Sequence, residues 1–114
     1  MNTCLFCKMA AGEIKPDMLL DTSEFMVFRD INPQAPVHLL VVPKRHIATL
    51  NDLRVEDSAL LGEMLLTAQR VTQQAGITDA GYRLVMNCNA DGGQTVFHLH
   101  MHLLGGRHMS WPPG

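Results

Sequence analysis

The sequence predicts one α+β domain built on a mainly antiparallel sheet, and three observations support this fold class. Residues 56–75 carry apolar side chains at the three- and four-residue spacing of an amphipathic helix. Strand-like segments lie before and after this helix, without the strand-helix alternation that a parallel sheet requires. The 114 residues, 46% of them hydrophobic, contain no repeat or low-complexity tract, so we treat residues 1–114 as a single domain.

The N-terminal part of the chain predicts a short helix followed by a hairpin. Residues 4–11 are compatible with a short helix that stops at Gly12, because glycine readily adopts the left-handed backbone conformation. Residues 18–20 and 25–28 are strand-like, and the turn-prone sequence DTS separates them. We therefore expect two short strands that form a hairpin.

The middle of the chain predicts a buried strand and the long helix. Residues 37–42 are rich in apolar and β-branched side chains and end at Pro43, which suits a strand buried on both faces. In the helix, Asp57 or Ser58 can cap the first turn by accepting a backbone N–H bond, and Gly76 can end the last turn. The helix is expected to pack through the stripe Leu60, Leu61, Met64, Leu65, Ala68, Val71 and Ala75.

The C-terminal part predicts two more strands joined by a turn. Residues 82–86 and 97–104 are strand-like, and the loop over residues 87–94 contains the turn sequence DGG. The period of two in the second strand places one set of side chains in the core and the other set on the opposite face. The side chains expected in the core are Phe97, Leu99, Met101 and Leu103.

Composition and charge exclude several classes of protein. Nine Lys and Arg against eleven Asp and Glu give a net charge of −2, which argues against binding to nucleic acid or to an anionic membrane. No apolar stretch reaches the roughly 20 residues of a transmembrane helix, and the N-terminus lacks the pattern of a secretory signal. With three cysteines we expect no disulfide framework, a cytoplasmic location and an isolated thiol at Cys88.

The sequence HLHMH places His98, His100 and His102 on one face of the last predicted strand, about 7 Å apart. Three adjacent imidazoles are poor packing material. They would suit a solvated face of an edge strand, a metal site, or nucleophilic catalysis by one imidazole whose neighbours hold its tautomer. The alternation alone leaves these three interpretations open.

The motif HLHMHLL resembles the signature of the histidine triad (HIT) superfamily, in which histidines alternate with apolar residues. The segments FRDINPQAPVHLLVVPKRHI, GGQTVFH and LGGRHMSWPPG are similar to those of its Hint branch, the purine nucleoside phosphoramidases, and the likeness covers about residues 4–114. It implies a five-stranded antiparallel sheet with one long and one short helix, and a homodimer whose two sheets join into one of ten strands. The active-site pocket would lie on the exposed face of each sheet.

The resemblance assigns catalytic roles to the triad and to the loop before it. His100 matches the central histidine, which attacks the α-phosphorus and becomes transiently nucleotidylated, a step that suits a neutral imidazole. His102 would bind the phosphate, and His98 completes the triad. The donors expected around the phosphoryl oxygens are the Gly93 N–H, the Gln94 amide and the Thr95 hydroxyl. Threonine stands here where the family usually has serine.

Three polar residues outside the triad match positions of the family's nucleotide site. Asp30 matches the carboxylate that accepts both ribose hydroxyls, although the sequence DINP also suits an Asx turn. His38 matches an outlying histidine with a proton-relay or positioning role, and a hydrogen-bonded core histidine is the alternative. Asn87 matches a residue near the 5′ phosphate, and a polar strand end is the alternative.

The residues that match the apolar purine pocket of the family are Phe6, Met9, Ile14, Phe28 and Ile31. Each of them would serve equally well in a core. Arg29 departs from the histidine that precedes the ribose-binding carboxylate in animal members. Trp111 matches a tryptophan that reaches across the dimer and shapes the partner's active site, whereas by composition alone the C-terminal tail is a disordered end.

Cys4 and Cys7 have a spacing that occurs both in metal sites and among small buried residues. The resemblance adds His46 and His98, because some bacterial histidine triad proteins and the related hexose-1-phosphate uridylyltransferases hold a structural zinc ion with such a set. Two thiolates and two imidazoles would form a closed tetrahedral site with no open position for catalysis. Catalysis itself would require no cofactor.

The expected function is hydrolysis of the P–N bond of purine nucleoside 5′-phosphoramidates through a nucleotidyl-His100 intermediate, which releases a nucleoside monophosphate and an amine. A dinucleoside polyphosphate or nucleotidyl hydrolase would use the same chemistry with a different leaving group. A nucleotide-binding interaction module would use the same pocket without needing turnover. A metal-storage or metal-sensing protein would instead use the triad as ligands.

Overall fold

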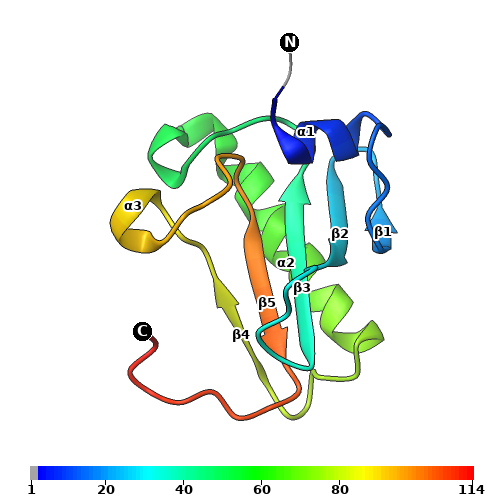
Figure 1. Cartoon of the computed structure of the whole chain (residues 1–114), viewed down its shortest axis with the longest axis vertical. Helices are drawn as coiled ribbons and strands as arrows, with labels where there is room; N and C mark the ends of the chain where they lie inside the picture. Colours follow the sequence, from blue (N-terminus) through cyan, green and yellow to red (C-terminus); the bar gives the residue numbers. More distant parts are fainter. Residues whose placement is uncertain (1–2) are drawn as a thin grey trace.

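The computed structural model describes residues 3–114, and within them a five-stranded antiparallel sheet has the order β1-β2-β3-β5-β4 (Figure 1). Its strands are β1 (Met18–Asp21), β2 (Phe25–Arg29), β3 (Val37–Pro43), β4 (Tyr82–Val85) and β5 (Met101–Gly105). The helices are α1 (Leu5–Ala10), α2 (Ser58–Gln74) and α3 (Asn89–Gly92), with 3-10 turns at Leu50–Asp52 and Val55–Asp57. The predicted α+β fold, with one long and one short helix, is confirmed, and the one-turn helix α3 is an addition.

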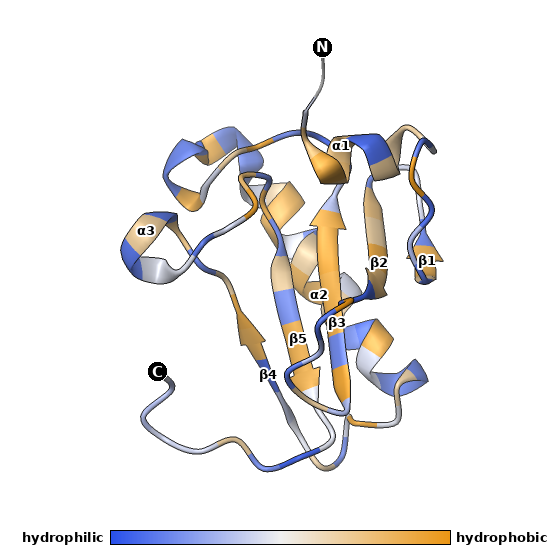
Figure 2. Cartoon of the chain, viewed as in Figure 1, coloured by the Kyte–Doolittle hydropathy of each residue, from blue (hydrophilic) through white to orange (hydrophobic). Residues whose placement is uncertain are grey.

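β3 lies at the centre of the sheet, where its alternating side chains serve two hydrophobic clusters. Leu39 and Val41 belong to the cluster that α2 covers, and Leu40 and Val42 belong to a cluster on the other face that Phe6 of α1 covers. Figure 1 shows α2 behind the sheet, and Figure 2 shows β3 as mostly hydrophobic. The prediction of a strand buried on both faces is therefore confirmed.

The long helix confirms the predicted apolar stripe except at one position. Met64, Ala68 and Val71 are buried against the sheet, whereas Leu65 is 52% exposed. Adjacent residues of a helix differ by about 100° in direction, so Leu65 is carried off the face on which Met64 lies. Gly76 has a φ of +73° and follows the last turn, as predicted.

The predicted side-chain cap at the start of α2 is wrong. The Asp57 carboxylate accepts from the Arg54 N–H over 2.9 Å and pairs with the Arg45 guanidinium. The Ser58 hydroxyl donates to the Val55 carbonyl oxygen over 2.6 Å. Because a 3-10 turn leads directly into α2, both side chains stabilise that turn and leave the first N–H groups of the helix uncapped by them.

β5 begins later than the sequence predicts. Its pairing with β3 starts at Met101, opposite Val41, instead of at residue 97. Phe97, which was expected in the core, is 49% exposed, while Leu99 is buried. The Leu99 N–H donates to the Ile47 carbonyl oxygen over 2.6 Å, so this stretch binds the segment that follows β3 and not β3 itself.

The short helix and the hairpin are confirmed. α1 ends shortly before Gly12, which has a φ of +80°. β1 and β2 pair with Met18 opposite Phe28 and Asp21 opposite Met26.

In the part of the chain that the structure describes, no helix has the length and apolar character needed to cross a membrane.

The C-terminal tail follows β5 without regular secondary structure and contacts its own chain. Nη2 of Arg83 donates to the Ser110 carbonyl oxygen over 3.0 Å, and the guanidinium carbon of Arg83 lies 5.9 Å from the centre of the Trp111 ring. Trp111 is nevertheless 80% exposed. The tail thus presents its indole to solvent.

Candidate active site

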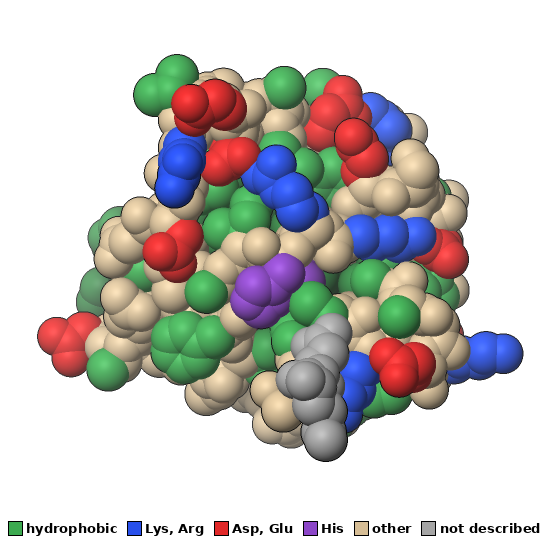
Figure 3. All heavy atoms as spheres, turned by 90° about the horizontal axis from the view of Figure 1, so that it is seen from above, with side chains coloured by type: hydrophobic (Ala, Val, Ile, Leu, Met, Phe, Trp, Pro, Cys, Tyr) green, Lys and Arg blue, Asp and Glu red, His purple; other side chains and the backbone are tan. Residues whose placement is uncertain are grey.

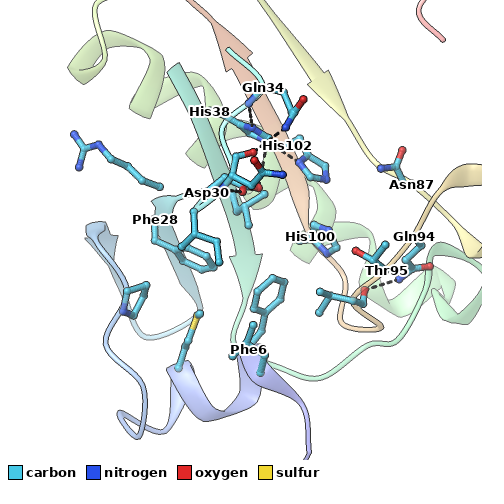
Figure 4. Close-up of a pocket in the computed structure, with 18 of the residues that line it drawn as sticks. Phe6, Phe28, Asp30, Gln34, His38, Asn87, Gln94, Thr95, His100 and His102 are labelled. Carbon is cyan, nitrogen blue, oxygen red and sulfur yellow. Dashed lines mark hydrogen bonds and ion pairs between the residues drawn. The ribbon is translucent and has the colours of Figure 1, made fainter. Parts of the chain in front are cut away.

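A cavity of about 390 Å³ opens on the face of the sheet opposite α2 (Figure 4). Its walls come from α1, the strands β2, β3 and β5 and the loop after α3, so segments distant in the sequence meet there. The predicted site residues that line it are Phe6, Met9, Phe28, Asp30, Ile31, His38, Asn87, Gly93, Gln94, Thr95, His100 and His102. The predicted residues Ile14, His98 and Trp111 are not among its lining residues.

His100 offers an unprotonated ring nitrogen to a ligand. Its Nδ1 lies 2.7 Å from the carbonyl oxygen of His98, which only accepts, so Nδ1 carries the ring proton. In the neutral ring Nε2 then holds a lone pair. The Phe6 ring packs edge-on against this imidazole, with 5.3 Å between the ring centroids. The backbone thus fixes the tautomer, and Phe6 limits the motion of the ring.

His38 and His102 form a hydrogen-bonded pair whose tautomers are set by the backbone (Figure 4). The Gln34 N–H donates to Nδ1 of His38 over 3.0 Å, so a neutral His38 carries its proton on Nε2. This Nε2 lies 2.9 Å from Nδ1 of His102 and donates to it. A neutral His102 must then carry its own proton on Nε2. That atom is therefore a hydrogen-bond donor for a ligand.

Burial keeps both members of this pair neutral near pH 7. Desolvation, together with the neighbouring imidazoles of His100 and His38, lowers the pKa of His102 to about 4, against the opposing attraction of the Asp30 carboxylate. Desolvation also lowers the pKa of His38, against the opposing attraction of the Asp30 carboxylate. The neutral state is the one that the hydrogen bond between the two rings requires.

Asp30 forms an Asx turn and also lines the cavity, so the turn does not exclude the ribose-binding role that the resemblance implies. Its Oδ1 accepts from the Asn32 N–H over 2.8 Å, which forms an Asx turn. Its Oδ2 lies 3.4 Å from Nε2 of His38, and the residue lines the cavity. A carboxylate has about four lone-pair sites, so these contacts leave acceptor capacity for the hydroxyls of a ligand.

The loop before the triad is internally bonded, and two of the donors expected to contact phosphate already have partners in the chain. The Gly93 N–H donates to a backbone carbonyl of α3, 3.0 Å away. The side-chain amide of Gln94 donates to the carbonyls of Ala48 and Val96 over 2.9 and 3.0 Å. Both groups therefore shape the loop. Within residues 3–114 the Thr95 hydroxyl has no such partner, so this donor of the segment is available to a ligand.

The side of the cavity away from Asn87 and Gln94 is apolar (Figure 4). Phe6 and Phe28 pack edge to face there, with 5.6 Å between their centroids. Further apolar side chains on the cavity wall are Leu5, Met9, Pro16, Ile31, Leu40 and Val96. This wall suits the flat, largely apolar faces of a nucleobase.

Arg29 also lines the cavity, and its guanidinium is held in an ion pair. Its Nη1 lies 3.1 Å from Oδ2 of Asp17, and both side chains are more than half exposed. It follows Phe28 in β2, and neighbouring residues of a strand point to opposite faces. The guanidinium is therefore directed away from the face on which Phe28 packs.

A second group of side chains, the cysteine-histidine cluster of Cys4, Cys7, His46 and His98, lies beside the cavity. Nδ1 of His98 is 3.2 Å from Sγ of Cys4, 3.5 Å from Sγ of Cys7 and 3.2 Å from Nδ1 of His46. One ligand atom from each residue lies within 4.8 Å of the others. Figure 3 looks onto the α1 end of the molecule, where histidine atoms reach the surface among hydrophobic and basic side chains.

His98 is oriented for the cysteine-histidine cluster and not for the cavity. Its side chain is fully buried, and its Nε2 donates to the Pro43 carbonyl oxygen over 2.7 Å. Nδ1 of the neutral ring then holds a lone pair directed at Cys4 and Cys7. Burial lowers the pKa of His98, which favours this neutral form. The backbone carbonyl of His98, and not its imidazole, contacts His100.

Several residues that line the cavity were not predicted from the sequence, and Gln34 is the most important of them. Its backbone N–H orients His38, yet the sequence NPQAP indicated only a break between strands. The useful signal in the sequence is the position of Gln34, in a loop four residues before a histidine of the next strand, where its backbone N–H can reach the ring. Asn32 also lines the cavity and was not predicted.

Comparisons with known proteins identify the family and the fold. The HIT domain family matches residues 11–109. The structure is similar to that of a HIT family hydrolase from Legionella pneumophila Philadelphia 1, with a TM-score of 0.96 and 54% identity, over 98% of this chain and 100% of that chain. An uncharacterised HIT-like protein of Synechococcus elongatus is 50% identical over 110 residues, which are 96% of each chain. The purine nucleoside phosphoramidase of Escherichia coli K12 is 47% identical over 103 residues, which are 90% of this chain and 87% of that protein.

Proposed function

Because the chain belongs to the HIT family, we propose that it hydrolyses the P–N bond of purine nucleoside 5′-phosphoramidates. The observation that carries this proposal is the tautomer of His100. Its Nδ1 donates to a backbone carbonyl, which leaves a lone pair on Nε2 at the wall of a cavity large enough for a nucleotide. A relative that is 47% identical is named a purine nucleoside phosphoramidase, which agrees with this choice of substrate.

In the first step Nε2 of His100 attacks the α-phosphorus and forms a P–N bond to the imidazole. The bond from phosphorus to the amine breaks, its electron pair leaves with the amine, and the amine takes up a proton that the Thr95 hydroxyl can pass on from solvent. In the second step a water oxygen attacks the phosphorus, the bond from phosphorus to Nε2 breaks with its electron pair returning to the imidazole, and a proton of the water passes to solvent. The products are a nucleoside monophosphate and an amine.

The neighbouring residues bind and orient the substrate. The Nε2–H of His102 donates to a phosphoryl oxygen, because its Nδ1 is occupied by His38. Asp30 accepts from the ribose hydroxyls with the lone pairs that its turn leaves unused. The base lies against Phe6 and Phe28. In this assignment His38 positions His102 and does not touch the substrate.

The cysteine-histidine cluster fits a structural zinc ion. Two thiolates and two imidazole nitrogens form the donor set that zinc prefers, and the hydrogen bond from His98 to Pro43 turns the correct ring nitrogen toward the sulfurs. The Cys7 N–H donates to Sγ of Cys4, which orients this sulfur within the cluster. Bound zinc would tie α1 to the segment after β3 and to the triad. No step of the proposed reaction passes through it.

We further propose that the protein acts as a homodimer. β4 is an edge strand of the sheet, and Leu65 and Leu66 on α2 are 52% and 49% exposed. An edge strand and exposed leucines are features that association with a second copy would cover. Sedimentation equilibrium of the purified protein tests this, since a mass of 12.6 kDa in solution would contradict it.

The proposed activity is tested by incubating the purified protein with adenosine 5′-phosphoramidate and following AMP release by phosphorus NMR. We expect turnover of the phosphoramidate and much slower cleavage of diadenosine polyphosphates at equal concentration. Faster cleavage of the diadenosine compounds would instead assign the related hydrolase activity. Tight AMP binding without turnover of either substrate would identify a nucleotide-binding interaction module.

A further inference from the structure

The chain turns sharply after β5 and packs against the loop over residues 32–36. A Cβ placed on Gly106 would lie 2.9 Å from the Cβ of Pro36, closer than real side chains approach, and Gly106 has a φ of +88°. Glycine is therefore required here both by the backbone conformation and by the close contact. The turn that begins the C-terminal segment is thus built to fit this loop.

Arg107, the next residue, fastens the same loop by hydrogen bonds. Its Nε and Nη2 donate to the carbonyl oxygen of Gln34 over 3.3 and 3.0 Å. Its Nη1 donates to the carbonyl oxygen of His108 over 3.1 Å. The planar guanidinium therefore donates at the same time to the carbonyl of Gln34 and to the backbone carbonyl of His108. A lysine ammonium lacks the geometry to make both contacts.

Gln34 connects the hydrogen bonds of Arg107 to the histidine pair in the cavity. While its carbonyl oxygen accepts from Arg107, its N–H donates to Nδ1 of His38. His38 in turn donates to His102 over 2.9 Å. Contacts therefore connect Arg107 through Gln34 and His38 to the Nε2–H of His102. Arg107 and Gln34 are 73 residues apart in the sequence.

We propose that Arg107 is a positioning residue that holds His38 and His102 in their productive tautomers by fixing the backbone of Gln34. The part of this inference that concerns turnover rests on the proposed phosphoramidase function. The part that concerns tautomers does not. Without Arg107, rotation of Gln34 withdraws the N–H from His38. The Asp30 carboxylate, 3.4 Å from Nε2, is a weaker restraint on the Nε2 proton, so a neutral His38 then also populates the form protonated on Nδ1.

The test compares the wild type with Arg107→Ala and Arg107→Lys, and uses Arg70→Ala as a matched control. Arg70 is an exposed arginine of α2 whose side chain pairs with Glu63, and it does not line the cavity. Nitrogen-15 NMR of the imidazoles at pH 7 reports which ring nitrogen of His38 and His102 is protonated. Parallel kinetics separate kcat from KM, and AMP titration gives Kd.

We expect the wild type and Arg70→Ala to show both rings protonated at Nε2, and Arg107→Ala to show signals averaged between the two tautomers. The value of kcat should fall on the order of tenfold in Arg107→Ala, while the AMP Kd changes less than about twofold, because alignment is lost and not the binding surface. Arg107→Lys should recover only part of kcat. Unchanged imidazole signals in Arg107→Ala would overturn the proposal.

The two possible failures are distinguishable. If the wild type does not hydrolyse phosphoramidates, the proposed function is wrong, and the NMR comparison still decides the role of Arg107. If Arg107→Ala lowers kcat but also melts at a much lower temperature than Arg107→Lys and keeps wild-type imidazole signals, the residue serves stability alone and the inference is wrong.

Discussion

His98 and His100 stand two residues apart in the same alternating sequence, yet the structure places them in two different environments. His98 donates from Nε2 to Pro43 and turns Nδ1 toward the sulfurs of a closed cluster. His100 donates from Nδ1 to the carbonyl of His98 itself and leaves Nε2 to an open cavity. The two imidazoles therefore present different ring nitrogens, Nδ1 in His98 and Nε2 in His100, to their surroundings.

The role of each histidine therefore follows from which of its ring nitrogens meets a backbone carbonyl. A carbonyl oxygen accepts and never donates, so its partner nitrogen is protonated and the other one is basic. In the cluster the basic nitrogen meets thiol ligands, whereas in the cavity it meets solvent or substrate. The two sites should therefore respond independently to substitution.

The largest expected effect is in the cavity. His100→Ala should lower kcat for adenosine 5′-phosphoramidate by at least about a thousandfold, because the nucleophile is lost, while the Kd for AMP changes less than about threefold. Rapid-quench trapping of a nucleotidyl adduct should succeed with the wild type and fail with the variant. The zinc content of the variant should match the wild type, and a loss of only a few-fold in kcat would contradict the assignment.

The next effect belongs to the cluster. Cys4→Ser with Cys7→Ser should reduce bound zinc from about one ion per chain to nearly none and lower the melting temperature by about 5–10 °C, because a closed site ties distant segments together. Mass spectrometry of the metal and calorimetry measure the two quantities. Cys88→Ser is the matched control, since this cysteine lies outside the cluster. Equal zinc in both variants would exclude the site.

A smaller effect sharpens the assignment of the cavity. Asp30→Asn should weaken AMP binding on the order of tenfold, since a charged acceptor for hydroxyls is replaced by a neutral one. Asparagine keeps an oxygen for the Asx turn with Asn32, so the loop is preserved. The affinity for 2′,3′-dideoxy-AMP, measured by calorimetry, should hardly differ between the wild type and the variant. An equal loss for both nucleotides would show that Asp30 acts on the fold and not on the ribose.

The smallest effect concerns acid stability. The pKa of His102 is about 4 in the folded protein and near 6.5 when unfolded, so the unfolded chain binds the proton more readily. This histidine therefore contributes its full stability above pH 6.5 and loses it as pH falls toward 4. His102→Asn should lose less free energy of unfolding than the wild type between pH 6.5 and 4.5, as measured by urea titration. Parallel losses in the two proteins would contradict the burial of His102.

The fold could be predicted because its signals are local. The alternation in β3 and the apolar stripe of α2 each follow from one contiguous segment, and Gly12 and Gly76 end their helices as expected. The errors arose where tertiary contacts compete with the local pattern. The Asp57 carboxylate, for example, accepts from the Arg54 N–H and pairs with the Arg45 guanidinium, and does not cap the helix N-terminus.

Many of the residues that line the cavity could be predicted from the sequence, but the hydrogen bonds between them could not. The triad, Asp30 and the cysteines follow from motifs, whereas the tautomers depend on carbonyls that only the fold brings near. Gln34 reaches His38 because the loop before β3 folds back, and no periodic signal marks that. Likewise, the Gln94 amide donates to the carbonyl oxygen of Ala48 as well as to that of Val96, and Ala48 lies 46 residues away in the sequence.

Ile31 lies at the cavity with its side chain 99% exposed, next to the buried Phe28 wall. A base that settles there takes apolar surface of both partners out of water, and such burial lowers the heat capacity of the complex relative to its parts. The enthalpy of nucleotide association should consequently become more negative as temperature rises, even where the affinity itself changes little. The temperature dependence of the binding enthalpy therefore reports how much apolar surface, including that of Ile31, the base buries.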